Sequence, residues 1–279
     1  MMMKIGIIGG SGLYEMADLE KVPPFGRPSA PLVQGELGGM GLVFLPRHGR
    51  GHTLMPAEIN YRANIYALKQ LGVGRILSIS AVGSMKEEIR PGDLVLVDQF
   101  IDRTSGREST FFGGGVVAHV PLADPVCPEM RQALARCCRQ LDIRFHPRGT
   151  YICINGPQFS TRAESNLYRR WGVDVIGMTN MPEARLAREA QICYATLALA
   201  TDYDCWKEDH DDVTIEAVLA IVRQNVENSQ RVIRRLATEL PAAASCACGR
   251  ALADTILTDP QAITAAARER LGLIFPDGG

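Results

Sequence analysis

Apolar and polar positions along this chain form alternating blocks that predict strands and helices in turn. Short apolar runs are typical of buried strands, and they occupy residues 4–8, 42–45, 75–81, 93–98, 150–154, 173–176 and 194–201. Apolar residues at helical spacing cover 56–71, 128–141, 161–171, 182–190, 214–240 and 260–271. Because the strands are apolar throughout, both sheet faces are expected to be covered. The pattern predicts one α/β domain with a mixed, partly parallel central sheet flanked by helices.

Polar residues gather where the predicted strands end. A glycine turn follows the first strand, Arg47 and His48 follow the second, and later groups lie at 80–84, 155–160 and 201–204. Ligand sites of such folds gather at the carboxyl ends of the strands. We therefore expect these groups to form one shared pocket.

The segment that contains Arg47 and His48 indicates an anion. Two Arg and two His stand within six residues, and a guanidinium presents a planar donor fork that suits phosphate. A solvated basic loop is the alternative. Hydroxyl and amide donors at Ser80–Ser84 and Thr179 complete a cradle for free phosphate without a metal. The glycine turn fails the dinucleotide spacing, because Glu15 stands where a third Gly is needed.

A pair of carboxylates, Asp202 and Asp204, ends a wholly apolar strand. Burial there raises a carboxyl pKa, and two neighbouring carboxylates raise it further, which suits a general acid. The alternative is a helix N-cap and a surface Asp. Phe159, after Gly156-Pro157, is either a stacking surface for a flat ring or a core residue.

Composition excludes several classes of function. Lys plus Arg total 30 against 31 Asp plus Glu, a formal charge of −1, so no nucleic-acid-binding face is expected. No apolar run reaches the roughly 18 residues of a membrane span. The first residues show no secretory signal pattern, and the expected location is the cytoplasm.

Eight cysteines are too sparse for a disulfide scaffold. They form no Cys-x-x-Cys pair and none has ligand spacing to one of the five His, so the spacing predicts no zinc site and no other metal. Cys246-Ala247-Cys248 is interpreted as a capped turn. The alternative is a redox pair, perhaps exchanging with another Cys.

A series of short motifs follows a fixed order along the chain. In that order the motifs are Gly9-Gly10-Ser11-Gly12-Leu13, Arg47-His48-Gly49-Arg50, Asn60-Tyr61-Arg62-Ala63-Asn64, Ser80-Ala81-Val82-Gly83-Ser84, Pro91-Gly92-Asp93, Gly156-Pro157-Gln158-Phe159-Ser160, Arg162-Ala163-Glu164, Met178-Thr179-Asn180-Met181-Pro182-Glu183 and Thr201-Asp202-Tyr203-Asp204-Cys205-Trp206. Together they resemble one known family, the 5′-methylthioadenosine phosphorylases of the purine nucleoside phosphorylase superfamily. The similarity covers about residues 3–240, and the tail resembles that of some archaeal and bacterial members.

The resemblance implies phosphorolysis of 5′-methylthioadenosine to adenine and 5-methylthioribose 1-phosphate, within purine and methionine salvage. It implies a catalytic domain over 1–240 and a helical extension over 241–279 on the same domain. The implied reaction uses inorganic phosphate as a co-substrate and requires no cofactor. The residues it assigns to phosphate are Ser11, Arg47, His48, Ser80, Ala81 and Thr179.

The family pattern also assigns the nucleoside contacts. Asp202 and Asp204 face the N7 and 6-amino edge of the purine as the catalytic pair. His119 reaches a neighbouring subunit's pocket near the 5′ group, in a trimer or hexamer. The other residues assigned to the nucleoside are Phe159 and Ser160 at the base, Met178 under the ribose, and Ile215.

Two positions depart from the family pattern, and alternatives stay open. Asn155 stands where many members have Glu, and Val82 where the animal enzymes have Cys. The first alternative is a 6-oxopurine or methylthioinosine phosphorylase, which Asp202 disfavours because that branch carries Asn there. The others are a hydrolytic nucleosidase and a non-catalytic nucleoside-binding module.

Overall fold

The computed structural model describes residues 3–9, 23–207, 215–241 and 243–275 of the 279-residue chain. Its described strands are β1 Lys4–Gly9, β2 Val33–Leu37, β3 Met40–Pro46, β4 Val73–Ser84, β5 Leu94–Val97, β6 Gln99–Asp102, β7 Phe145–His146, β8 Thr150–Cys153, β9 Val175–Gly177 and β10 Cys193–Asp202. The helices are α1 Tyr61–Gln70, α2 Pro128–Gln140, α3 Arg162–Arg170, α4 Asn180–Glu189, α5 Ile215–Glu239 and α6 Ala265–Leu271.

The strands form one mixed sheet, with the order β2-β3-β1-β4-β10-β5-β7 along its main path. The four strands β3, β1, β4 and β10 are parallel neighbours, whereas β2 pairs antiparallel with β3, β5 with β10, and β9 with β4. A second branch, β6-β8-β9, attaches to β4. The predicted fold class is therefore confirmed. The parallel centre brings four strand ends to one edge.

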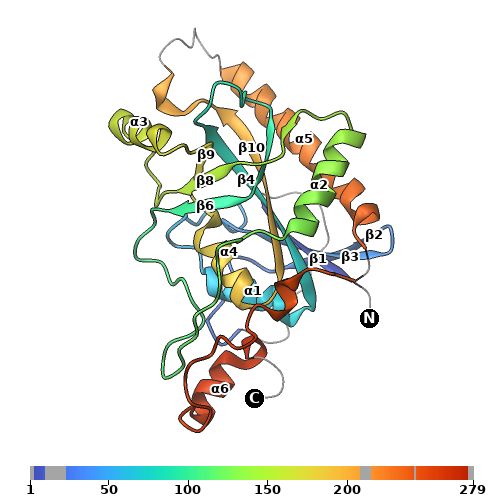
Figure 1. The fold of residues 1–279 in the computed structure, drawn as a ribbon. Helices are drawn as coiled ribbons and strands as arrows, with labels where there is room; N and C mark the ends of the chain where they lie inside the picture. The colour runs from blue at the N-terminus through green and yellow to red at the C-terminus, as the bar shows by residue number, and fades with distance from the viewer. Residues whose placement is uncertain (1–2, 10–22, 208–214, 242, 276–279) are drawn as a thin grey trace.

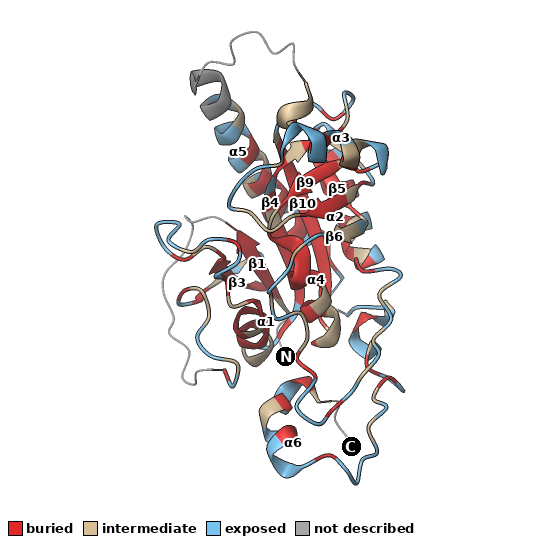
Figure 2. Cartoon of the chain, turned by 90° about the vertical axis from the view of Figure 1, so that its left-hand side faces the viewer, coloured by how far each residue is buried: buried red, intermediate tan, exposed pale blue. Residues whose placement is uncertain are grey.

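The sheet separates two hydrophobic layers. On one face α1 and α4 cover the sheet, and on the other face α2 and α5 cover it, as Figures 1 and 2 show. In β1 the side chain of Ile8 joins the α1/α4 layer, whereas Ile5 and Ile7 join the α2/α5 layer. All three are at most 3% exposed. Alternation along apolar strands thus fills both layers, as expected for a sheet covered on both faces.

Helix α1 begins five residues later than the periodicity predicts. Pro56 was expected to open the helix, but Asn60 is its N-cap, and the Asn60 side chain accepts a hydrogen bond from the Ala63 N–H. The Tyr61 hydroxyl donates to the Pro56 carbonyl at 2.9 Å, which holds residues 56–60 as a turn. A side-chain cap at Asn60 therefore sets the helix start in place of Pro56.

The long loop over residues 103–118 is packed against the chain's C-terminal segment. Phe111 and Val116 are fully buried, although the glycine content predicts a mobile loop. Arg270 of α6 donates to the Phe111 and Gly113 carbonyls. The C-terminal residues that share the α1/α4 core are Leu252, Ile263, Ala267, Leu271 and Ile274.

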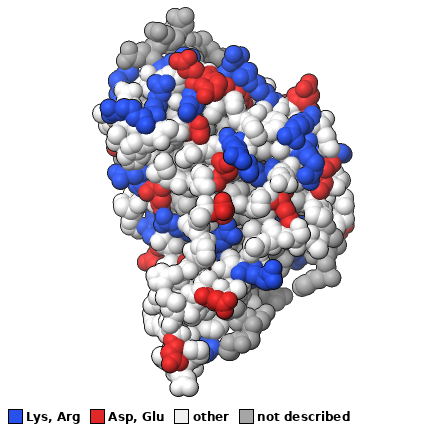
Figure 3. All heavy atoms as spheres, viewed as in Figure 1, with Lys and Arg blue, Asp and Glu red and all other residues white. Residues whose placement is uncertain are grey.

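Two observations concern the helices and the surface of the described residues. No described helix is both long enough and apolar enough to cross a membrane. Figure 3 shows Lys and Arg side chains interspersed with Asp and Glu over the face in view.

Candidate active site

A cavity of about 600 Å³ opens at the carboxyl edge of the parallel strands. Gly9 ends β1 there, Pro46 ends β3, and the end of β4 and Asp202 of β10 complete the floor. The size is typical of a small-molecule site. Ten of the residues predicted for the site line this one cavity: Arg47, His48, Ser80, Ala81, Phe159, Ser160, Met178, Thr179, Asp202 and Asp204.

Arg47 lies at the end of β3, and the protein itself holds most of its guanidinium. Its Nε and Nη2 donate to the two oxygens of Glu183 at 2.7 and 3.0 Å. Nη2 also donates to Ser78, and Nη1 donates to the Ile79 carbonyl at 3.2 Å. Four of the five N–H groups are thus engaged, which leaves one for a ligand. Arg47 is 3% exposed, so this is a buried ion pair beneath the cavity.

The Glu183 carboxylate is the centre of a buried polar network that the sequence reasoning missed. It accepts from Ser78 at 2.7 Å and from the Tyr194 hydroxyl at 2.8 Å, besides Arg47. Asn180 donates to both Ser78 and Tyr194. Burial of a charge requires such partners. The available signal was Glu183 within a matched motif, but the sequence separation of 136 residues from Arg47 conceals the pair.

His48 lies half-buried in the cavity wall and stacks on His52, with ring centroids 4.2 Å apart. Its Nδ1 contacts the Leu54 carbonyl at 2.9 Å, so Nδ1 carries the proton and donates. Burial, followed by the charges of Arg47 and His52, lowers the pKa of His48. The lowered pKa favours the neutral ring, whose Nε2 accepts a hydrogen bond and does not donate one.

Tyr151 supports the hydroxyls beside Arg47. Its hydroxyl lies 3.2 Å from Ser80 Oγ and accepts from the Thr179 N–H at 3.4 Å. Gly177 permits this arrangement, because a Cβ there would lie 2.0 Å from the Tyr151 oxygen. The structure thus places the Ser80 and Thr179 hydroxyls on the cavity wall from two different elements.

The two carboxylates lie together over Gly83 of β4, although β10 ends between them. A Cβ at Gly83 would lie 3.1 Å from Asp202 Oδ1 and 3.4 Å from Asp204 Cβ. Asp202 Oδ1 accepts the Asp204 N–H at 2.8 Å, and its Oδ2 accepts from Thr201 at 2.7 Å. Asp204 adopts a φ of +51° and opens the short turn Asp204–Trp206.

Only one of these two carboxylates, that of Asp204, is partly buried as the sequence predicts. Asp202 is exposed, contrary to the expectation from its apolar strand. Burial raises the pKa of Asp204, the nearby charge of Asp202 raises it further, and the hydrogen bond from Ser165 opposes both. Of the two, Asp204 is therefore the carboxyl that burial helps to keep protonated.

The remaining wall is apolar with one unpaired hydroxyl. Phe159 is 82% exposed at the cavity, which excludes the core interpretation for it in this chain. Ser160 Oγ is buried and has no hydrogen-bond partner in the described structure. Met178 lies against Gly156, where a Cβ would overlap its sulfur. The wall thus combines two apolar side chains with a free donor and acceptor.

The cationic and acidic groups approach the cavity from different strands. Arg47 and His48 follow β3, and Asp202 ends β10, with β1 and β4 between these strands. The Arg47 guanidinium reaches across to the Ile79 carbonyl of β4, the strand next to β10. One cavity therefore offers anion donors at one end and an acid pair at the other.

Of the predicted site residues that the structure describes, His119 lies outside the cavity. His119 is exposed, and its N–H donates to the Thr255 carbonyl next to the C-terminal segment. Ser11 and the Ile215 side chain lie outside the described part of the chain. Asn155 bonds Ser105 in place of lining the cavity, and Val82 lines it.

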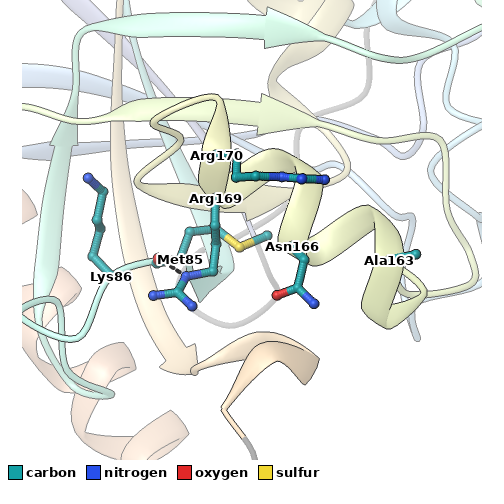
Figure 4. A pocket seen from close by; sticks show the side chains of 6 residues that line it. All are labelled: Met85, Lys86, Ala163, Asn166, Arg169 and Arg170. Atoms are coloured by element: carbon teal, nitrogen blue, oxygen red, sulfur yellow. Dashed lines mark hydrogen bonds between the residues drawn. The ribbon is translucent and has the colours of Figure 1, made fainter.

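A second, open depression of about 710 Å³ lies beside α3 (Figure 4). Arg169 lines this depression. Its guanidinium carbon lies 3.7 Å from the centre of the Trp206 ring, and its Nε donates to the Met85 carbonyl at 3.1 Å. Lys86 pairs with Asp174 at 3.7 Å. The predicted anion donors and the carboxylate pair line the cavity at the strand ends and not this depression, so that cavity is the better candidate site.

Four cysteines come together in the structure, a grouping that the spacing along the sequence does not predict. Cys127, Cys193, Cys246 and Cys248 converge, with all four sulfurs within 4.8 Å of one another. They come from three segments far apart in sequence, which the search for local ligand spacing cannot detect.

Comparisons with known proteins agree with this geometry. A family profile described as "Phosphorylase superfamily" matches residues 4–238. The S-methyl-5′-thioadenosine phosphorylase of Geobacter sulfurreducens is 57% identical over 278 residues, with 97% of each chain covered. The corresponding protein of Thermofilum pendens is 51% identical over 261 residues, covering 91% of this chain and 99% of its own.

Solved structures show the same relationship. The crystal structure of a methylthioadenosine phosphorylase from an antarctic soil metagenomic library has a TM-score of 0.92 at 48% identity, with 99% of each chain covered. A variant of the Schistosoma mansoni adenosine/methylthioadenosine phosphorylase, in complex with methylthioadenosine, has a TM-score of 0.79 at 40% identity, covering 85% of this chain and 91% of its own. This chain therefore belongs to the phosphorylase superfamily, within its group of methylthioadenosine phosphorylases.

Proposed function

We propose that this protein cleaves 5′-methylthioadenosine with inorganic phosphate, giving adenine and 5-methylthioribose 1-phosphate in purine and methionine salvage. The observation that carries the proposal is the single cavity with anion donors at the β3 end and a carboxylate pair at the β10 end. The names of its relatives state the same activity.

At the β3 end, phosphate is held by His48, Ser80, Thr179, the Ala81 backbone and the free N–H of Arg47. Ser11 is assigned to the same anion from its glycine turn. Cleavage of the glycosidic bond develops positive charge on the sugar, and an anion fixed opposite the base stabilises that charge. Phosphate is then the nucleophile, so no covalent enzyme intermediate is required.

At the β10 end, the Asp202 and Asp204 pair supplies the proton that purine N7 takes as the base departs. The raised pKa of Asp204 supports storage of a proton in this pair above the ordinary range of a carboxyl. Phe159 and Ser160 flank the base, and Met178 lies under the ribose. The chemistry of these steps requires no cofactor besides the phosphate co-substrate.

An assay for adenine release from methylthioadenosine, with and without phosphate, tests the proposal. Phosphorolysis predicts release that depends on phosphate and yields the sugar 1-phosphate. Equal release without phosphate would instead identify a hydrolytic nucleosidase. Faster turnover of methylthioinosine would identify the 6-oxopurine alternative, and binding without any turnover would identify a binding module.

The protonation of His48 predicts a pH dependence of phosphate use. Nδ1 donates to the Leu54 carbonyl, so the ring offers a second donor to phosphate only when it is protonated. Because burial lowers the pKa of His48, binding phosphate through a protonated ring takes up a proton near neutral pH. The phosphate KM is therefore expected to rise between about pH 6 and pH 8.

The matched variant for this prediction is His48→Gln, which keeps a hydrogen-bonding side chain that does not titrate. We expect the variant to lose the rise in phosphate KM across that range, with steady-state kinetics at saturating nucleoside as the measurement. An identical pH slope in both proteins would assign the proton to phosphate itself.

We infer that the active protein is a homo-oligomer, a trimer or hexamer, whose subunits share active sites. The support is the exposed position of His119 away from its own chain's cavity, together with the family pattern. The cytoplasmic location also stays a prediction, with cell fractionation as its test.

Subunit mixing tests the shared site. Mixed oligomers of inactive His119→Ala and inactive Asp202→Ala subunits are expected to regain part of the wild-type activity, because some sites receive both intact residues. Native mass spectrometry first verifies that mixed oligomers form. No recovery in verified mixtures would contradict sharing.

A further inference from the structure

Four thiols meet at the side of the molecule where α2 begins. Cys127 is the N-cap residue of α2, and Cys193 is the first residue of β10. Cys246 and Cys248 belong to the turn after α5, which Figure 1 shows returning beneath the sheet toward α6. Cys127, Cys193 and Cys248 are 1%, 3% and 5% exposed, and Cys246 is partly buried, so the cluster is largely shielded from water.

We propose that Cys127, Cys193, Cys246 and Cys248 bind one zinc ion as a structural tetrathiolate site. A tetrahedral ion with zinc–sulfur bonds of about 2.3 Å places its sulfurs about 3.8 Å apart. The Cys246 sulfur lies 3.7 Å from that of Cys127 and 3.3 Å from that of Cys193. The largest separation among the four is within 4.8 Å, so small side-chain adjustments bring all four to bonding distance.

The donor set selects the class of metal. Four sulfurs suit a soft or borderline ion such as zinc and are poor ligands for magnesium or calcium. Because all four positions are protein ligands, the site is closed, as structural zinc sites are. Binding converts four thiols and Zn²⁺ into a complex of charge −2 and releases four protons.

Neighbouring groups stabilise that negative charge. The guanidinium of Arg188 approaches Cys248 Sγ at 3.9 Å and also donates to the Asp124 carbonyl. Cys127 stands at the N-terminus of α2, where the helix dipole favours a thiolate. A buried complex of charge −2 thus has a cation and a helix end beside it.

Such a site would anchor the C-terminal segment to the sheet. Beyond Cys248, the Leu257 N–H donates to the Val117 carbonyl at 2.9 Å, and the Thr255 carbonyl accepts from His119. The segment therefore packs on the loop that carries His119. The metal role is stabilisation, and it does not depend on the proposed catalytic activity.

Metal analysis of the whole protein tests the proposal. The protein is purified under reducing conditions without chelator, and zinc is measured by mass spectrometry together with free thiols. We expect about one zinc per chain in the wild type and in Cys137→Ala/Cys138→Ala, whose free cysteines lie outside the cluster. Cys246→Ser/Cys248→Ser is expected to retain less than about a tenth of that zinc.

A second measurement uses the wild-type protein, so its result does not depend on whether Cys246→Ser/Cys248→Ser folds. Cobalt added to metal-free, reduced wild-type protein is expected to give the visible absorption of a tetrahedral cobalt thiolate, and zinc is expected to abolish it. Zinc is also expected to raise the Tm of the wild type and of the control variant. Reduced wild-type protein that binds neither ion would overturn the proposal. So would native protein whose cluster cysteines are joined as disulfides, detected by a mass two hydrogens lower for each bond.

Discussion

Asp202→Asn is expected to lower kcat/KM for methylthioadenosine by roughly 10²–10³-fold, the usual loss for one transition-state donor. Adenine presents an acceptor at N7 and a donor at its 6-amino group, and the carboxyl pair matches both. An amide at position 202 does not transfer a proton to N7. The loss should fall on kcat more than on nucleoside binding, and initial rates at saturating phosphate measure both.

The same change should alter the preference for the purine. A 6-oxopurine presents an acceptor at position 6, which a carboxylate repels and an amide can donate to. Activity on methylthioinosine should therefore fall less, or rise. Combining Asp202→Asn with Asp204→Asn should shift the preference further, because the second amide can also donate to the 6-oxygen.

The decisive quantity is the ratio of kcat/KM for methylthioadenosine over methylthioinosine. Lys86→Ala serves as a control, because Lys86 lies at the depression beside α3 and not in the cavity. An unchanged ratio in Asp202→Asn would mean that Asp202 does not contact the 6-position edge.

Arg47→Met is expected to destabilise the fold by about 3–5 kcal/mol, because it leaves the Glu183 carboxylate buried without its cation. Both side chains are at most 3% exposed, so solvent does not screen the loss. Glu183→Leu should cost a similar amount by stranding the guanidinium. Urea unfolding at neutral pH measures both free energies.

The double variant Arg47→Met/Glu183→Leu distinguishes the stability that comes from pairing the two charges from the stability that comes from their other contacts. It is expected to be less destabilised than the sum of the single changes by more than about 1 kcal/mol, because neither charge remains unpaired. Some cost stays, since Ser78 and Tyr194 lose their acceptor. Additive single effects would contradict a coupled ion pair.

The kinetics of Arg47→Met distinguish a phosphate-binding role of Arg47 from a purely structural one. If its free N–H contacts phosphate, Arg47→Met raises the phosphate KM more than the nucleoside KM at a temperature where the variant is folded. Equal losses in both constants would assign Arg47 to the buried network alone.

Short-range patterns determined much of this fold. Apolar runs located β1, β3, β4, β8 and β10, because a strand buried on both faces needs an apolar residue at nearly every position. The pattern missed β2, β6 and β7, which are short and only partly buried. The start of α1 was misplaced because Pro56 and Asn60 are both start signals, and contacts decide between them.

Much of the site also followed from the chain order. Polar residues after parallel strands must meet at one edge of the sheet, so ten assigned residues line one cavity. What the individual groups do depends on their partners. Burial acts on Asp204 and leaves Asp202 exposed, although the two residues stand two positions apart at the end of one strand.

The sequence by itself thus determined the strands, the sheet edge and the family of this protein, because each depends on neighbours in the chain or on contiguous motifs. Tertiary structure decided the pairing of Arg47 with Glu183 and the meeting of Cys127 with Cys246, across 136 and 119 residues. Local spacing carries no information on such pairs. The packing of the sheet brings them together, and burial then makes each charge or thiol depend on its partner.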